Sequence, residues 1–197
     1  MLFDKQQIKI GVTGSIGAGK TFVTQVFSRF GFPVFNADIE ANKCMHENSY
    51  LKKDIQSLFG NEVYINGALQ KKFLANIVFN DKKKLQELNN LVHPLVKKSF
   101  ENWCEISRSN IVIKEAAILF ESNTHLGLDK IICVSAEKEL RIKRVMKRDS
   151  IARDQVLSRM SSQISQHEKE KLSDFVIVND GINLLLPQII KIIDQIS

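Results

Sequence analysis

The chain has 197 residues, of which 44% are hydrophobic and 25% charged, and its formal net charge at pH 7 is +6. This length fits one compact domain, and the apolar fraction is sufficient for a hydrophobic core. No apolar run reaches the roughly 18 residues of a membrane span, and residues 1–7 lack the apolar segment of a signal peptide. We therefore expect a soluble cytoplasmic protein without a membrane partner.

The cysteines and the net charge indicate which ligands the chain could bind, but they do not identify one ligand. Cys44, Cys104 and Cys133 are far apart and form no C-x-x-C spacing, so we predict reduced thiols and neither a disulfide framework nor a zinc site. The isoelectric point of about 9.2 favours an anionic partner. Because the excess charge is modest and spread along the chain, it fits a nucleotide as well as a nucleic acid.

The N-terminal part of the sequence predicts a strand, a glycine-rich loop and a helix. Residues 8–13 form a short apolar run that ends before a glycine, which is typical of a buried strand. Apolar residues then recur with helical spacing from Phe22 to Phe30, and Gly31 is expected to end this helix. A second short strand is predicted at 33–36.

The middle of the chain is mainly helical in pattern. We predict a helix at 39–47 and further helices within 49–109, interrupted by a turn at 60–67. A helix boundary is expected at His93 and Pro94, because the residue before a proline disfavours the helical conformation.

Strands and helices alternate again in the last 90 residues. Strands are predicted at 111–115, 131–134 and 175–178, a basic helical stretch at 137–159 and a polar segment at 161–173. The final amphipathic helix is expected to place one apolar face on the core, formed by Leu186, Ile189, Ile190, Ile193 and Ile196. This alternation predicts an α/β fold with a parallel sheet covered on both faces. No repeat or linker divides the chain.

The loop after the first strand fits the motif G-x-x-x-x-G-K-[S/T] through Gly14, Gly19, Lys20 and Thr21. In this motif backbone amides and a helix N-terminus face phosphate oxygens, the lysine reaches the β and γ phosphates, and the hydroxyl can bind Mg²⁺. The flanking strand and helix disfavour a chance match in a glycine-containing turn. The motif predicts binding of a nucleoside triphosphate, but GTPases, ATPase motors and kinases share it.

Two acids could complete a phosphoryl-transfer site. Asp38 and Glu115 follow predicted strands, and ligand-binding groups in an open α/β sheet gather at the carboxyl ends of strands. A helix N-cap is the alternative interpretation of Asp38, and an ion pair with a lysine is the alternative for Glu115.

The basic stretch contains Arg141, Arg144 and Arg148 at positions i, i+3 and i+7, which places them along one helical face. Guanidinium groups suit phosphate oxygens, so we favour a lid that closes over the nucleotide. A solvated basic face is the alternative.

Six segments of the chain together resemble the dephospho-CoA kinase family in order and approximate spacing, over nearly the full length. They are the phosphate-binding loop, FNADIEAN at 35–42, HPLV at 93–96, ILFES at 118–122, RVMKRD at 144–149 and SDFVIVNDG at 173–181. The resemblance implies transfer of the γ-phosphoryl group of ATP, with Mg²⁺, to the ribose 3′-hydroxyl of dephospho-CoA, the last step of coenzyme A synthesis. It implies no nucleic-acid partner and a monomer or small homo-oligomer.

The resemblance also implies the fold and the site. The fold is a P-loop NTPase-type three-layer α/β fold, with a core at 8–48, 110–136 and 174–197, a helical substrate-binding insertion at about 49–109 and a helical lid at about 137–173. The nucleotide site comprises Gly14, Ser15, Ile16, Gly17, Ala18, Gly19, Lys20, Thr21, Phe22, Asn179 and Asp180, and Thr21 also binds the metal. The acceptor site comprises Asp38, His93, Glu115, Phe120 and Glu121. Asp38 would orient or deprotonate the 3′-hydroxyl, and Lys20, Arg144 and Arg148 would stabilise the transferring group. From its residues alone, His93 is an ordinary histidine at a helix end.

The chain departs from the family pattern at two places. The family usually reads D-A-D where this chain has Asn36, Ala37 and Asp38, and it usually reads D-x-P-L-L-F-E where this chain has EAAILFE at 115–121. Both departures concern the acceptor pocket rather than the phosphate site. The competing functions are another P-loop kinase, for nucleosides or nucleoside monophosphates, and a nucleic-acid-binding ATPase suggested by the basic stretch at 137–159.

Overall fold

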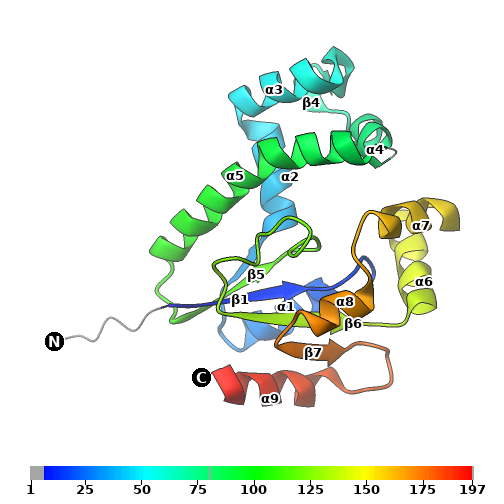
Figure 1. Ribbon diagram of the computed structural model, residues 1–197. Helices are drawn as coiled ribbons and strands as arrows, with labels where there is room; N and C mark the ends of the chain where they lie inside the picture. Colours follow the sequence, from blue (N-terminus) through cyan, green and yellow to red (C-terminus); the bar gives the residue numbers. More distant parts are fainter. Residues whose placement is uncertain (1–6, 80, 197) are drawn as a thin grey trace. The chain divides into compact units, whose positions relative to one another are not determined.

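The computed structural model describes residues 7–79 and 81–196, which form two compact units (Figure 1). Residues up to Asn36 and from Cys104 onward belong to the first unit, and residues from Ala37 to Trp103 belong to the second. The expectation about a signal peptide concerns residues 1–7, of which 1–6 lie outside the described residues. No helix among the described residues is both long and apolar enough to span a membrane.

The first unit is built on a parallel sheet, as the alternation of strands and helices predicts. Five strands lie in the order β2-β5-β1-β6-β7, and every neighbouring pair is parallel. The inner strands β1, β5 and β6 are mostly buried on both faces, which explains why they read as nearly continuous apolar runs in the sequence. The strands are β1 (Ile8–Thr13), β2 (Val34–Asn36), β5 (Ile111–Glu115), β6 (Lys130–Ser135) and β7 (Phe175–Val178).

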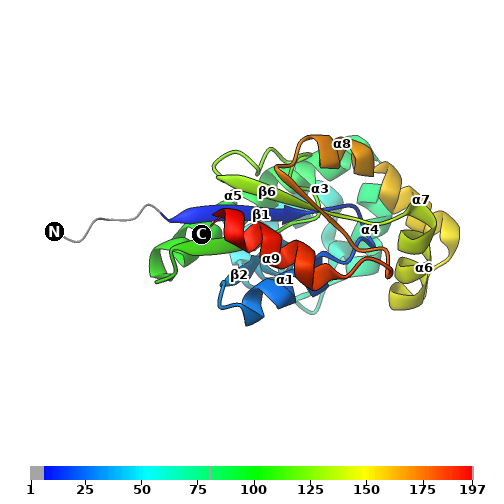
Figure 2. The same ribbon diagram turned by 90° about the horizontal axis from the view of Figure 1, so that it is seen from below.

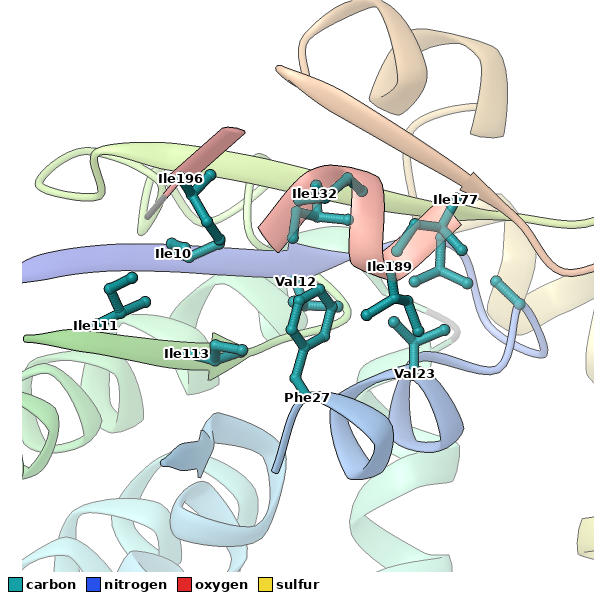
Figure 3. Packing of buried hydrophobic residues seen from close by; sticks show 13 residues of the cluster. Ile10, Val12, Val23, Phe27, Ile111, Ile113, Ile132, Ile177, Ile189 and Ile196 are labelled. Atoms are coloured by element: carbon teal, nitrogen blue, oxygen red, sulfur yellow. The ribbon is translucent and has the colours of Figure 1, made fainter. Parts of the chain in front are cut away.

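Helices cover both faces of this sheet. Helices α1 (Lys20–Arg29) and α9 (Leu185–Ile196) share one hydrophobic core with the sheet, where Phe27 and Ile189 are fully buried (Figures 2 and 3). Strand residues alternate between faces, so Ile132 points into this core and Cys133 points to the opposite face. There the side chain of Gln166, the first residue of α8 (Gln166–Lys171), donates a hydrogen bond to the Cys133 thiol. The unit therefore has three layers.

Two more helices of the first unit together cover most of the predicted basic stretch at 137–159. They are α6 (Lys138–Asp149) and α7 (Arg153–Ser161), so the stretch is not one continuous helix. Ser150, between them, adopts a left-handed conformation with φ 52° and ends α6. All three cysteines, Cys44, Cys104 and Cys133, are free thiols in the structure.

The second unit is mainly helical. It contains a β-hairpin at the predicted turn, formed by β3 and β4 around Asn66 and Gly67. Both turn residues have positive φ, 50° and 77°, which is the conformation of the Asn-Gly hairpin turn. The elements are α2 (Ala37–Glu47), α3 (Ser49–Phe59), the 3-10 helix η1 (Asn61–Val63), β3 (Tyr64–Ile65), β4 (Ala68–Leu69), α4 (Lys71–Phe79) and α5 (Lys82–Ile106), which ends in the first unit.

The helix boundary expected at His93 and Pro94 is wrong, because α5 continues through Pro94. A proline inside a helix removes one backbone hydrogen bond and crowds the preceding turn, at a cost of about 3 kcal/mol. Val92, Val96 and Phe100, on both sides of the proline, are buried. Their burial along one helical face compensates for that cost, which local sequence rules do not include.

The core-facing residues of α9 also differ from those expected. Ile189, Ile192 and Ile196 are buried, whereas Leu186 and Ile190 are 51% and 41% exposed. The apolar residues of this helix form one broad stripe, and Leu186 and Ile190 lie toward one edge of it, so spacing alone could not decide which part of the stripe faces the sheet.

The observed face of α9 predicts unequal effects of two neighbouring isoleucines. Ile192→Ala should lower the free energy of unfolding by about 2–5 kcal/mol, because it leaves a cavity in the core. Ile190→Ala, the matched control, should cost under about 1 kcal/mol. Urea denaturation of both variants tests this, and a larger loss for Ile190→Ala would contradict the packing described here.

Candidate active site

The glycine-rich loop connects β1 to α1 in a conformation that requires glycine. Gly17 and Gly19 have φ of 82° and 93°. A Cβ atom at Gly17 would lie 2.5 Å from the backbone oxygen of Arg141, and one at Gly19 would lie 2.1 Å from the Asn179 amide nitrogen. Gly19 is also the N-cap of α1 and supplies no side-chain hydrogen bond to the first helical turn. The N-terminus of α1 can therefore bind an anion.

The side chain of Lys20 folds back toward the start of the loop that precedes it. Its Nζ donates a hydrogen bond to the backbone oxygen of Gly14 at 3.0 Å, and the residue is only 9% exposed. The loop is further closed by a hydrogen bond from the Ala18 amide to the Ser15 carbonyl. The ammonium group is thus held at the concave side of the loop, where phosphate oxygens bind in this motif.

The Glu115 carboxylate organises the end of the sheet next to the loop. It accepts hydrogen bonds from Thr21 Oγ1 at 2.7 Å, Thr24 Oγ1 at 2.9 Å and Asn36 Nδ2 at 3.0 Å. The register of the strands explains why Asn36 reaches Glu115, because these two residues lie opposite each other on β2 and β5. On the other side of β5, Val12 of β1 lies opposite Glu115. The alternative of a lysine ion pair is wrong, since no cation pairs with this 3% exposed carboxylate among the described residues.

Asn36 and Glu115, which both depart from the family pattern, are therefore joined by one hydrogen bond. At Asn36 the side chain is an amide, and its N–H donates to Glu115. An aspartate in its place would offer only acceptor oxygens to a carboxylate. The amide at position 36 is thus compatible with the longer acid at position 115.

Arg144, predicted to stabilise the transferring group, and Asn179, predicted at the nucleotide site, both bind backbone carbonyls at or next to the loop. Arg144 Nη1 donates to the carbonyl of Asn179 at 3.0 Å and reaches the carbonyl of Gly17 at 3.5 Å. The Asn179 side chain donates to the carbonyl of Ala18 at 2.8 Å. Since these hydrogen bonds go to the carbonyls of Gly17, Ala18 and Asn179, neither residue occupies an amide of the loop.

Two glutamines at the loop were not foreseen from the sequence. The amide of Ser15 donates to Gln166 Oε1 at 3.1 Å, and the amide of Ile16 donates to Gln163 Oε1 at 2.9 Å. Both glutamines come from the polar segment at 161–173, which carries no recognisable motif. Only its proximity to the loop in the fold reveals the contact.

Arg148 and Asp180 are engaged in local interactions. Arg148 forms a two-pronged ion pair with Asp149 at 2.7 and 3.1 Å, and these hydrogen bonds lower the pKa of Asp149. The Asp180 carboxylate accepts from the backbone amides of Asn183 and Ile182, which lower the pKa of Asp180. Neither side chain contacts the loop in this conformation through a hydrogen bond among the described residues.

Glu121, in the segment after β5, forms a buried ion pair with Lys169 of α8. Glu121 Oε1 lies 2.8 Å from Nζ of Lys169, whose side chain is fully buried, and it also accepts from the amide of Ile164 at 3.1 Å. The Phe120 ring packs at 5.2 Å from the ring of His125. Glu121 therefore ties α8 to the loop after β5. Phe22, in contrast, is 57% exposed on α1.

Asp38 and His93 belong to the second unit. Asp38 is the second residue of α2 and exposed, so it does not occupy the N-cap position. His93 lies inside α5 rather than at a helix end, so the interpretation as a helix-end histidine is wrong. Both side chains are thus carried by regular helices.

The comparisons with known proteins decide the family. The model of the family described as dephospho-CoA kinase matches residues 8–184. A dephospho-CoA kinase from Bacteroides fragilis is 37% identical over 187 residues, which cover 94% of this chain and 91% of the relative. The chain belongs to the dephospho-CoA kinase family.

Solved structures agree with this family and confirm the predicted fold. A Thermus thermophilus protein, TT1252, has a TM-score of 0.85 at 30% identity, and the match covers 98% of this chain and 99% of the other. A dephospho-CoA kinase from Campylobacter jejuni has a TM-score of 0.67 at 32% identity, covering 96% of both chains. The α/β fold with a central parallel sheet is therefore shared with P-loop kinases of this family.

The contact between Asn36 and Glu115 predicts a new pH dependence in Asn36→Asp. Two carboxylates at hydrogen-bond distance raise the pKa of the pair in the folded state, so folding favours the protonated form. The variant should match the wild type near pH 4 and become less stable by about 1–3 kcal/mol as the pH rises to 7. Asn36→Ala, which adds no charge, should show no such pH-dependent loss. Parallel curves for wild type and Asn36→Asp in urea denaturation from pH 4 to 7 would contradict the contact.

The buried pair predicts a large cost for Glu121→Gln. The change leaves the buried ammonium of Lys169 without its countercharge, and we expect a loss of about 3 kcal/mol or more in the free energy of unfolding. Glu139→Gln removes the same charge from an exposed pair with Arg153 and should change stability little. Thermal and urea unfolding at pH 7 check both variants; equal effects would show that the Glu121 pair contributes no more than a surface pair.

Proposed function

We propose that this protein transfers the γ-phosphoryl group of ATP to the ribose 3′-hydroxyl of dephospho-CoA, which yields coenzyme A. Membership of the dephospho-CoA kinase family, over residues 8–184, is the observation that carries the proposal. The loop geometry supports it, because this loop is the phosphate-binding element of P-loop kinases. The proposed cofactors are ATP and Mg²⁺, and the proposed compartment is the cytoplasm.

The nucleotide phosphates are proposed to bind the loop from Gly14 to Phe22. The uncapped N-terminus of α1 supplies amides, and Lys20 supplies a positive charge next to them. Asn179 and Asp180 follow β7 and would border the adenine. Arg144 binds the carbonyls of Gly17 and Asn179, and Arg148 would exchange Asp149 for phosphate oxygens when the segment at about 137–173 closes as a lid.

The residues next to Lys20 fit Mg²⁺. The Thr21 hydroxyl donates its hydrogen bond to Glu115, so its lone pairs remain available for a metal ion. Hydroxyl and carboxylate oxygens are ligands that Mg²⁺ prefers, and phosphate oxygens and water would complete the set. When bound, Mg²⁺ would neutralise charge on the phosphates.

The acceptor is proposed to lie against Asp38, His93, Glu115, Phe120 and Glu121. In this assignment Asp38 orients the 3′-hydroxyl and accepts its proton, while Lys20 stabilises the charge on the transferring group. Positioning and electrostatics supply most of the rate enhancement in phosphoryl transfer, so little covalent chemistry is required from the protein. The helical insertion at about 49–109 would supply the remaining acceptor contacts.

The reaction is tested directly by mass spectrometry. Purified protein with Mg²⁺ and ATP should convert dephospho-CoA to coenzyme A, and Lys20→Ala should abolish the product while leaving the fold intact. Nucleosides and nucleoside monophosphates, supplied separately, should not be phosphorylated. Phosphorylation of one of these in preference to dephospho-CoA would overturn the proposed acceptor.

The role of Asp38 is tested by two substitutions in one helical turn. Asp38→Asn should lower kcat about 10²–10⁴-fold, because the amide cannot accept the proton of the hydroxyl. Glu40→Gln removes the other acid of the first turn of α2 and should retain near-normal turnover. Steady-state kinetics of both variants give the answer, and a kcat close to wild type in Asp38→Asn would sink the assignment.

A further inference from the structure

A cavity of about 380 Å³ lies in the first unit beside the phosphate-binding loop. It touches the loop at Ser15 and is otherwise bounded by α6, the end of α7 and the segment leading into α8. Its volume falls within the range of small-molecule sites. The lining residues are Ser15, Lys138, Arg141, Leu157, Met160, Ser161, Gln163, Ile164, Ser165 and Gln166.

The cavity contains a buried cation that forms no direct ion pair among the described residues, and the negative charge that acts on it most strongly, Glu170, lies outside the lining. Arg141 is 8% exposed, and its Nε donates to the carbonyl of Ala136 at 2.9 Å. Among the described residues, its terminal amino groups form no ion pair or hydrogen bond, and no aspartate or glutamate lines the cavity. A buried charge is costly unless it is paired, so this guanidinium favours an anion in the cavity. Burial also lowers the pKa of Arg141, although an arginine stays charged at neutral pH.

The other polar groups of the lining add positive charge and hydrogen-bond donors. Lys138, an exposed residue, contributes a second positive charge. The acceptor oxygens of Gln163 and Gln166 already bind the amides of Ile16 and Ser15. These two oxygens are therefore occupied, and the charge of the lining is wholly positive. Three apolar side chains complete the wall: Leu157, Met160 and Ile164.

We propose that this cavity is a phosphate-binding subsite, with Arg141 as its principal ligand and Lys138 as a second cation. The guanidinium fork matches phosphate oxygens, and the apolar wall would contact the organic part of a phosphate ester. The assignment rests on the proposed function only for the choice of nucleotide in its test. The phosphate has two possible sources, the transferring group and a phosphate of the second substrate.

Calorimetric titration of inorganic phosphate into ADP-saturated protein tests the subsite. The wild type should bind phosphate, and Arg141→Met should weaken this binding about tenfold or more, as expected for loss of a charged hydrogen bond. Arg153→Met removes an exposed arginine paired with Glu139 and should bind phosphate normally. Absence of phosphate binding in the wild type, or equal binding by Arg141→Met, would overturn the proposal.

A second variant covers the case in which Arg141→Met does not fold. Gln163→Glu keeps an acceptor oxygen for the Ile16 amide and adds a negative charge to the cavity lining. Its phosphate affinity should fall about tenfold or more. Unchanged phosphate affinity in this variant, with ADP binding retained, would equally contradict the subsite.

Two nucleotides distinguish the sources of the phosphate. With a non-hydrolysable ATP analogue in place of ADP, loss of phosphate binding would assign the subsite to the transferring group. Retained binding would assign it to a phosphate of the second substrate. Formation of coenzyme A is measured separately, so failure of the proposed reaction and failure of the subsite give different results.

Discussion

The buried carboxylate of Glu115 is the interaction on which the phosphate-binding end of the first unit depends. It accepts hydrogen bonds from α1 through Thr21 and Thr24 and from β2 through Asn36. These bonds fix the start of α1 against the ends of β2 and β5. Since the loop is attached to β1 at one side and to α1 at the other, its conformation follows from this anchoring. A hydroxyl proposed to bind Mg²⁺ is oriented by the same carboxylate.

Much of the first unit could be predicted from the sequence because its determinants are local. Strands β1 and β5 are buried on both faces over most of their length, so each is a short apolar run with clear ends. The loop follows a motif in which each residue type has a chemical role. The failures lie where packing overrides local preference. Burial on both sides of Pro94 keeps α5 continuous, and contact with the sheet selects Ile192 rather than Ile190 as the buried residue.

The candidate site was predictable only in part, for a related reason. Glu115 and Lys20 stand at positions that a strand end or a motif identifies. Gln163 and Gln166 meet the loop across 147 and 151 residues of sequence, and no pattern marks them. The spacing of the arginines on α6 placed them on one face correctly, yet Arg141 is buried and Arg148 is paired at the surface. Helical periodicity indicates on which face of the helix a side chain lies, but it does not reveal which groups that side chain contacts.

The contacts of the segment at 137–173 also limit how a lid could move. At its N-terminal side, Arg144 binds loop and β7-end carbonyls; at its C-terminal side, Gln166 binds the Ser15 amide and Lys169 pairs with Glu121. These bonds fix both ends of the segment to the sheet and the loop. Movement that preserves them must therefore be concentrated between the two ends, in α7 and the end of α6. Because α7 and α6 both border the cavity beside Ser15, such movement would change the volume of that cavity while the loop keeps its conformation. The proposed lid could thus close without breaking the contacts to the loop, since those contacts lie at the two ends of the segment and α7 lies between them.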